Sequence, residues 1–319
     1  MNERADLFRQ LLRVRMVEEA IAEHYPKWQM RCPVHLSIGQ EAAAVGVCSR
    51  LRCSDRVMSG HRSHAHYLAK GGALLPMLLE IHGKADGCSS GRGGSMHLLD
   101  IEAGFHGAVP IVGSTIPIAT GLSFADKLDG RDNVTAVFFG EAATEEGVFA
   151  ESVNFAALHD LRVLFVCENN LYSVYSPIEV RQPPERSITA FAGAHGVVSF
   201  HADGNDLDFV RDATGEALRQ MSARPGPKLL LLDTYRWREH CGHGYDNHIG
   251  YRTEEEYLAW KERDPLEMFR ERLTAENAID ATGVSKMMAE ISREIQEAFS
   301  AAESAPFPVP GSMFAHLLK

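Results

Sequence analysis

The sequence predicts an α/β fold, in which a parallel sheet is covered by helices on both faces and helical segments extend both ends of the chain. From the middle of the chain onward, four strand-like runs occupy residues 133–141, 162–169, 197–204 and 227–236, and the first of them is a continuous apolar run rich in β-branched and aromatic residues. Helix-patterned segments follow the first and the third of these runs. Continuous apolar strands that alternate with helices are typical of a parallel sheet buried on both faces.

The N-terminal part of the chain is expected to be helical. Residues of about 5–24 carry an amphipathic pattern. A second helix is expected over residues 37–51, beginning with Ser37 or with a turn at Gly39, and a third over residues 76–84. These helices precede the first predicted strand, so a helical extension is expected at this end of the domain.

Helices are also expected between and after the strands. Residues 144–161 predict a helix with Thr144 as its N-cap and two glutamates in its first turn, where the helix dipole favours acids. Residues 206–223 predict the helix that joins the last two strands. The remaining helical patterns lie at 264–273 and 283–302, after the last strand.

We expect a single domain over residues 1–319. The chain has no internal repeat, low-complexity tract or linker-like segment, and 45% of its residues are hydrophobic, which is sufficient for a sizeable core. Within this domain we expect an N-terminal helical segment over residues 1–30 and a C-terminal helical extension over residues 253–319.

Composition argues against several classes of partner. The formal net charge is -11 and the basic residues are not clustered, so neither nucleic acid nor an acidic membrane surface is expected as the main partner. No apolar run approaches the ~18 residues of a membrane-spanning helix, and the charged N-terminus lacks the apolar core of a signal peptide. The six cysteines contain no C-x-x-C pair. We therefore expect a cytoplasmic protein.

Polar side chains follow two neighbouring predicted strands. Glu141 comes directly after the strand that ends at Gly140, and Asn170 follows the next strand. Ligands of open parallel sheets bind beyond the carboxyl ends of the strands, and carboxylate and amide oxygens suit Mg²⁺. The pattern therefore favours a magnesium–diphosphate site, to which the following helix would direct its N-terminus. The alternative left open by these residues is that Glu141 caps that helix and Asn170 makes a turn.

The spacing of these residues resembles the thiamin diphosphate motif, in which a Gly-acid pair is followed by Asn-Asn about thirty residues later. Further segments look like the α subunit of 2-oxo acid dehydrogenase E1 enzymes of the pyruvate, acetoin and branched-chain types. These segments are GSMHLLD, GSTIPIATGLSFADK, FAALHDLRVLFVCENNLYSVYSP, ADGNDLDFVRDA and TYRWREHCG with GYRTEEE. The resemblance implies the thiamin diphosphate-binding fold, with thiamin diphosphate and Mg²⁺ as cofactors.

The resemblance also implies roles for individual residues. Glu141, Asn170 and the carbonyl of Tyr172 would hold Mg²⁺, and Arg62 would contact the diphosphate. Pro110 and Val112 would line the aminopyrimidine site. The complete set expected to bind cofactor is His61, Arg62, Pro110, Val112, Gly140, Glu141, Ala142, Ala143, Asn170, Tyr172 and His240. The family usually has Gly-Asp-Gly where this chain has Gly-Glu-Ala, and Tyr where it has His61.

Two histidines are expected to act in catalysis. His240 matches the active-site histidine of the family, and His35 matches a second histidine on the substrate side. A histidine near neutral pKa can donate or accept protons during carbonyl chemistry. The local runs HRSHAH and HCGHGYDNH lack the regular spacing of zinc sites, so we expect no histidine-based metal site from them.

The implied activity needs a second chain. The resemblance implies decarboxylation of a pyruvate-like 2-oxo acid, or cleavage of acetoin, with transfer of the acyl group to a lipoyl-bearing E2. In these enzymes the glutamate that activates the cofactor comes from a β subunit, so an α2β2 heterotetramer is expected. The alternative is a non-oxidative thiamin-dependent lyase or carboligase acting on a small carbonyl or sugar substrate, which the unusual loop over residues 241–249 motivates. A non-enzymatic scaffold is a third possibility.

Overall fold

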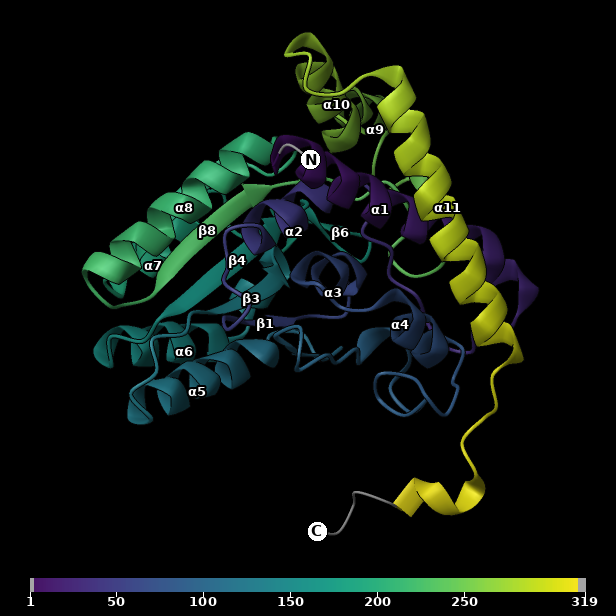
Figure 1. Ribbon diagram of the computed structural model, residues 1–319. Coiled ribbons are helices and arrows are strands. Elements are labelled where there is room, and N and C mark those ends of the chain that lie inside the picture. Colours follow the sequence, from purple (N-terminus) through teal and green to yellow (C-terminus); the bar gives the residue numbers. More distant parts are fainter. Residues whose placement is uncertain (1–2, 315–319) are drawn as a thin grey trace.

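The computed structural model describes residues 3–314, except for the side chain of residue 313, and has a six-stranded parallel sheet at its centre. The strand order is β2-β1-β3-β4-β8-β7, and each neighbouring pair is parallel; the central strands β1, β3, β4 and β8 are labelled in Figure 1. The strands are β1 Arg56–Ser59, β2 Phe105–Ala108, β3 Thr135–Gly140, β4 Val163–Asn169, β7 Val198–Asp203 and β8 Lys228–Asp233. A separate antiparallel pair, β5 Tyr172–Ser173 and β6 Ser176–Pro177, follows β4. The expected α/β fold is confirmed.

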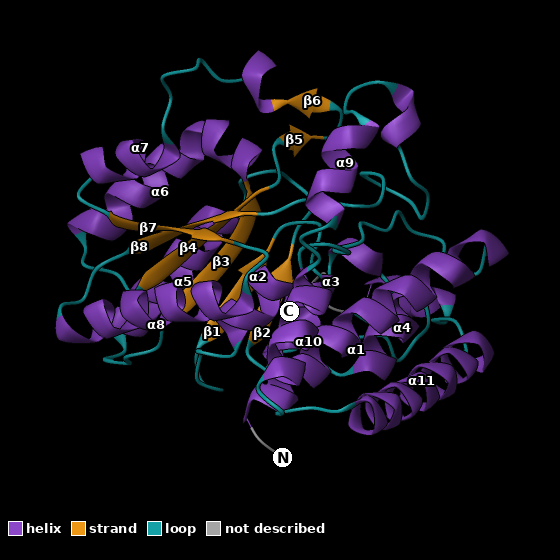
Figure 2. Cartoon of the chain, turned by 90° about the horizontal axis from the view of Figure 1, so that it is seen from above, coloured by secondary structure: helices purple, strands orange, loops and turns teal. Residues whose placement is uncertain are grey.

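Helices cover both faces of the sheet (Figures 1 and 2). One face carries α5 Thr115–Leu128, α6 Gly147–Leu158 and α7 Ile188–Ala194, and the other carries α2 Glu41–Cys48, α3 His64–Lys70 and α8 Leu207–Ala223. Successive side chains of a strand point to opposite faces. Accordingly, Val137 and Phe139 belong to the apolar cluster under α5–α7, whereas Ala136 and Phe138 belong to the cluster on the other side.

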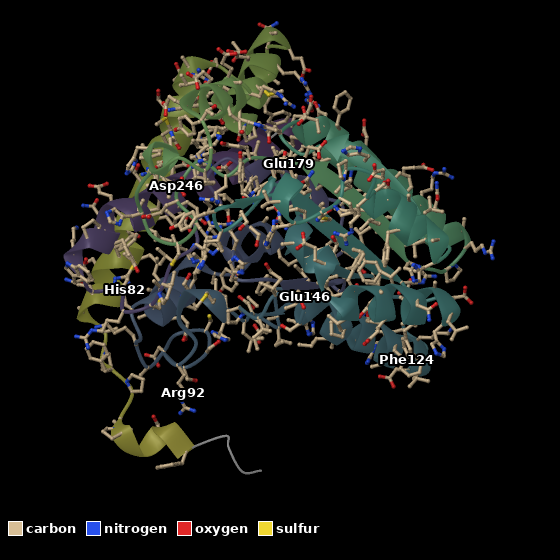
Figure 3. All side chains as sticks on the ribbon, turned by 180° about the vertical axis from the view of Figure 1, so that it is seen from behind. His82, Arg92, Phe124, Glu146, Glu179 and Asp246 are labelled. Atoms are coloured by element: carbon tan, nitrogen blue, oxygen red, sulfur yellow. The ribbon has the colours of Figure 1, made fainter. Side chains whose placement is uncertain are left out.

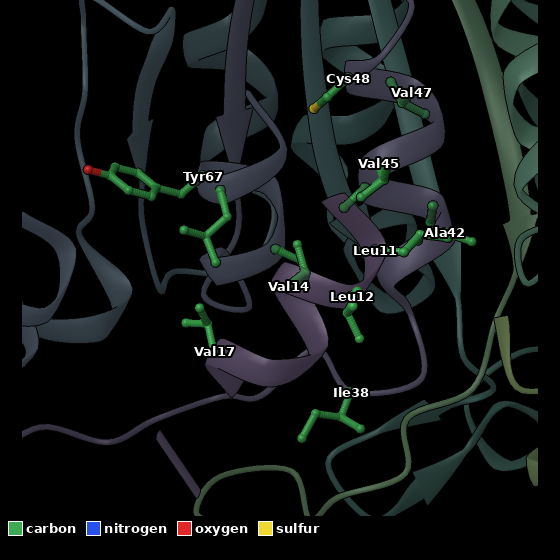
Figure 4. Close-up of a cluster of buried hydrophobic side chains, with 14 of the residues drawn as sticks. Leu11, Leu12, Val14, Val17, Ile38, Ala42, Val45, Val47, Cys48 and Tyr67 are labelled. Atoms are coloured by element: carbon green, nitrogen blue, oxygen red, sulfur yellow. The ribbon is translucent and has the colours of Figure 1, made fainter. Parts of the chain in front are cut away.

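The helical extensions pack on the second face and on each other. They comprise α1 Glu3–His24, α4 Leu74–Ile81, α9 Glu254–Lys261, α10 Pro265–Ala275 and α11 Ala281–Ser304. The ring of His82, directly after α4, lies 5.9 Å from the ring of Phe299 in α11, and Figure 3 shows His82 beside that helix. Leu11 and Val14 of α1 lie in one buried cluster with Val45 of α2 (Figure 4). The extensions thus share the core of the sheet.

Short 3₁₀ helices complete the chain. They are η1 Tyr25–Lys27, η2 Gly94–Met96, η3 Glu141–Glu145, η4 Ile178–Val180, η5 Asn247–Ile249 and η6 Pro310–Phe314. Residues 1–2 and 315–319, which the domain prediction includes, lie outside the described part of the chain. Among the helices described, none is long and apolar enough to cross a bilayer.

Two predicted helix starts are wrong. The second helix begins at Glu41 with Gln40 as its N-cap, not with Ser37 or Gly39. The helix after β3 begins at Gly147 with Glu146 as its N-cap. Thr144 lies in η3 instead, and its hydroxyl donates to the Glu141 carbonyl at 2.7 Å, so it does not cap α6. Consequently the element that follows Glu141 is a tight turn, and the helix starts two residues later than predicted.

Candidate active site

The strand order creates a crevice at one edge of the sheet. The chain runs from β1 outward to β2, then crosses back to β3 on the other side of β1. The connections after β1 and β3 therefore leave in opposite directions, and a ligand crevice is expected beyond the carboxyl ends of these strands. A cavity of about 250 Å³ lies there, and residues that follow β1, β2, β3 and β4 line it.

Every predicted site residue lines this cavity. The residues that the structure brings together are His35, His61, Arg62, Pro110, Val112, Gly140, Glu141, Ala142, Ala143, Asn170, Tyr172 and His240. His61 and Arg62 follow β1, Pro110 follows β2, Glu141 follows β3 and Asn170 follows β4. Their convergence is therefore a direct consequence of parallel strands that end at one edge of the sheet.

Glu141 is a buried carboxylate with a cation beside it. Only 1% of its surface is exposed, and this burial raises its pKa, an effect that the neighbouring Arg181 guanidinium partly offsets. Arg181 donates hydrogen bonds to both Glu141 and Glu145. Its guanidinium therefore supplies the positive charge beside the buried Glu141 carboxylate, although Arg181 was not among the residues predicted from the sequence. The Glu141 side chain does not cap α6, since Glu146 is the N-cap there. The chemistry of this position therefore suits a bound cation.

Asn170 makes a turn hydrogen bond and also lines the cavity. Its Oδ1 accepts a hydrogen bond from the Tyr172 backbone N–H at 3.2 Å, which is the turn role left open from sequence. The residue is buried and also lines the cavity next to Glu141. A carbonyl oxygen has two lone pairs, so one turn hydrogen bond leaves Oδ1 with acceptor capacity for a hard cation.

Arg62 is a cation without a carboxylate partner. Its guanidinium donates to the backbone carbonyl of Leu36 at 2.6 Å and to that of His240 at 3.1 Å, and it forms no ion pair with any described residue. Burial, together with the charge of Arg236, lowers the pKa of Arg62 to about 9. A cation that is partly removed from water is costly unless an anion accompanies it. The site therefore offers an anion position at Arg62 and a cation position at Glu141, which fits a metal–diphosphate group.

Three histidines form one corner of the cavity. The ring centroids of His35 and His61 are 4.6 Å apart, those of His35 and His240 are 5.0 Å apart, and those of His61 and His240 are 5.4 Å apart. An isolated parallel bridge between His35 and Gly242 brings the two loops together. Burial, followed by the charge of Arg62, lowers the pKa of His35 to about 2, that of His61 to about 4 and that of His240 to about 3. All three imidazoles are therefore neutral at pH 7.

Further lining residues were not selected from sequence. His66 binds Ser59 at 2.8 Å and Glu168 at 3.2 Å, and both buried side chains border the cavity. Ile111 also lines it, although 69% of its surface is exposed. The alternation of β4 places Glu168 on this side of the sheet, but its partner His66 could be found only from the folded structure.

The fold and the cavity define a thiamin diphosphate-type enzyme subunit, and comparison with known proteins agrees. A family model described as dehydrogenase E1 component matches residues 9–311, and the chain belongs to this family. This membership confirms the resemblance found in the sequence and the expected cofactors, thiamin diphosphate with a divalent metal.

Individual relatives are similar over nearly their whole length. The α subunit of the acetoin:2,6-dichlorophenolindophenol oxidoreductase of Bacillus subtilis is 36% identical over 303 residues, which cover 95% of this chain and 89% of the relative. The α subunit of the pyruvate dehydrogenase E1 component of Rickettsia felis is 33% identical over 307 residues, covering 96% and 93%. The Rhizobium meliloti counterpart is 32% identical over 312 residues, covering 98% and 88%. These relatives are named as α subunits, and E1 α subunits of this family work with a β subunit.

Proposed function

We propose that this chain is the α subunit of a thiamin diphosphate- and Mg²⁺-dependent E1 component that decarboxylates a pyruvate-like 2-oxo acid or cleaves acetoin. The observation that carries this proposal is the cavity between the ends of β1 and β3, which presents an unpaired cation, Arg62, and a buried carboxylate, Glu141. The names of the relatives, pyruvate dehydrogenase and acetoin oxidoreductase, indicate the substrate class.

In this proposal the protein binds the cofactor and handles protons. Glu141, Asn170 and the carbonyl of Tyr172 would hold Mg²⁺, while Arg62 would hold the diphosphate. The chemistry that thiamin diphosphate supplies when bound is a carbon nucleophile and storage of the electron pair left as carbon dioxide departs. His35 and His240 are neutral, so each can donate a ring N–H hydrogen bond to the substrate oxygen, whereas their lowered pKa values make them weak proton acceptors. Nδ1 of His35 is available for this role, because it has no hydrogen-bond partner among the described residues.

The partner proposal rests on the exposed rim of the cavity. Ile111 and Val112 line it, yet 69% and 47% of their surfaces are exposed, and Ile118 in the adjoining α5 is also exposed. Clustered exposed apolar side chains favour a protein interface. We place a β-type subunit there in an α2β2 heterotetramer, with a lipoyl-bearing E2 as the acyl acceptor. A single-domain organisation and a cytoplasmic location belong to the same proposal, although one relative, from Solanum tuberosum, is named as mitochondrial.

A non-oxidative lyase or carboligase is the second candidate, and the loop after His240 favours it. Residues 241–249 include the exposed Cys241 and differ from the serine- and aspartate-rich loop usual in the family. In the structure this loop folds around Asp246, which is labelled in Figure 3 and pairs with Arg236 and Arg252. A different loop beside His240 would change how a bulky acyl acceptor reaches the cavity. It would have less effect on the residues at which decarboxylation is proposed to occur.

One experiment separates the two candidates. The chain, co-expressed with its β-type subunit, is assayed with pyruvate, branched 2-oxo acids and acetoin, using either 2,6-dichlorophenolindophenol or an isolated lipoyl domain as acceptor. The E1 proposal predicts reduction of the dye and acylation of the lipoyl domain, both lost in His240→Gln. Substrate turnover without acylation of any lipoyl domain would favour the lyase or carboligase. Absence of turnover with every substrate would contradict both.

A further inference from the structure

We propose that His35, His61 and His240 together bind a divalent transition metal of the zinc class, at a position separate from the magnesium site at Glu141. Each histidine offers one ring nitrogen, and these three nitrogens all lie within 4.8 Å of one another. They come from three loops, after η1, β1 and β8. Because they are 26 and 179 residues apart along the chain, local sequence spacing does not indicate the group.

The histidines lack the partners that would otherwise explain their positions. Only 7% of the surface of His35 is exposed, and its buried Nδ1 has no hydrogen-bond partner in the described structure. The rings of His61 and His240 likewise make no hydrogen bond with any described residue and contact each other and His35 edge-on. A buried atom such as His35 Nδ1 normally finds a partner, and one ring nitrogen each of His61 and His240 lies within 4.8 Å of the ligand atom of His35, so the three rings together indicate a ligand.

The donor set selects the class of metal. Three neutral imidazoles with an open fourth position facing a cavity are the ligands of catalytic zinc sites, and they also suit Co²⁺, Ni²⁺ and Cu²⁺. Mg²⁺ prefers oxygen ligands and is directed to Glu141 and Asn170. Tetrahedral zinc with Zn–N distances of about 2.0–2.1 Å places ligand nitrogens roughly 3.3 Å apart. The three ring nitrogens must therefore move closer together when the ion binds. The partial exposure of His61 and His240 leaves their rings room to rotate.

The nearby charges limit the affinity. Arg62 lies beside the three rings and opposes a second positive charge, and no carboxylate is hydrogen-bonded to any of these rings among the described residues. Carboxylate partners normally strengthen histidine ligands. We therefore expect a site that exchanges its metal and is emptied by a chelator.

Metal occupancy has a consequence for catalysis, and this consequence alone rests on the proposed function. A metal ion bound to the ring nitrogens of His35 and His240 would occupy the position at which these rings are proposed to meet the substrate oxygen. Zinc is therefore expected to inhibit the enzyme reversibly, with the chelator restoring activity.

The test is a cobalt titration of the full chain in complex with its β-type subunit, in saturating Mg²⁺ so that the oxygen site is filled. Tetrahedral Co²⁺ on imidazoles gives intense visible d–d bands, which report the site without an activity measurement. The wild type should bind one Co²⁺ per chain, competitively with Zn²⁺. His61→Tyr and His61→Gln should each weaken binding about tenfold or more, because a ligand is removed. The surface variant His201→Gln, whose ring pairs with Asp233, should bind as the wild type does.

The outcomes separate this proposal from the proposed function. Absence of cobalt bands in the wild type would overturn the proposed metal site, and so would cobalt binding by both folded His61 variants equal to that of the wild type. Neither result would bear on the proposed E1 function. Absence of E1 activity in a wild-type complex that does bind cobalt would overturn the proposed function instead. Circular dichroism and unfolding midpoints of the variants verify that they fold.

Discussion

Arg181 competes with any metal ion that Glu141 binds. Its guanidinium pairs with Glu141 and Glu145, and the Glu141 side chain is 1% exposed, with Arg181 at 12%. Arg181 donates to Oε1 of Glu141, so a Mg²⁺ ion bound by this carboxylate would meet a cation that is already paired with it. Arg181→Gln should therefore tighten Mg²⁺ binding, whereas a merely structural pair would leave metal affinity unchanged.

The magnitude follows from the contact that is lost. A hydrogen bond to a charged group contributes about 1.5–3 kcal/mol when solvent does not screen it, and about 1.4 kcal/mol corresponds to a factor of ten in affinity. Mg²⁺ should therefore bind Arg181→Gln about tenfold to a hundredfold more tightly. The same substitution should lower the stability of the metal-free protein by a similar free energy, because Glu141 loses its counter-charge while it stays buried.

Calorimetric titration of Mg²⁺ into the α/β complex, with thiamin diphosphate present, measures this effect. Arg186→Gln is the matched control, because Arg186 bonds the carbonyl and hydroxyl of Thr144 in the same turn without touching Glu141. Unchanged or weaker Mg²⁺ binding in Arg181→Gln, or an equal gain in Arg186→Gln, would refute competition at Glu141.

Three further predictions concern stability. Gly39→Ala should destabilise the fold by about 2 kcal/mol or more in denaturant titrations, because Gly39 has φ +98° and an added Cβ would lie 2.5 Å from the Tyr235 carbonyl. Asp246→Ala should cost about 3–5 kcal/mol, since it leaves the buried Arg236 and Arg252 without their carboxylate, and an unchanged unfolding midpoint would contradict this. Burial lowers the pKa of His82, so its neutral form favours the fold, and stability should fall as pH drops below about 6.5; His82→Leu should flatten this decline in thermal scans from pH 7 to pH 5.

The central strands were predictable because their burial leaves a strong signal. β3 and β4 are continuous apolar runs, as strands buried on both faces require. β1 and β2 were missed, since each has only four residues and the sequence of β2 reads Phe-His-Gly-Ala. The helix α5 was also missed, because its threonines and glycine obscure the helical period. Short elements acquire their conformation from tertiary pairing, which single-sequence patterns do not contain.

The site was predictable where strand ends fix the position of a side chain. Glu141 and Asn170 were placed from the pattern alone, while His35 and His240 were selected through resemblance to a family. Arg181 could not be predicted, because its contact with Glu141 depends on how a loop forty residues away returns to the sheet. The grouping of the three histidines likewise depends on the bridge between His35 and Gly242.

The most direct test of this account is titration calorimetry of thiamin diphosphate with Mg²⁺ on the chain co-purified with its β-type subunit, comparing wild type with Glu141→Ala. Saturable, metal-dependent binding is expected in the wild type and should be lost in the variant, because in the proposed function Glu141 supplies the buried carboxylate for the metal. Absence of binding in the wild type, or equal binding in Glu141→Ala, would contradict the assignment of this cavity as the cofactor site.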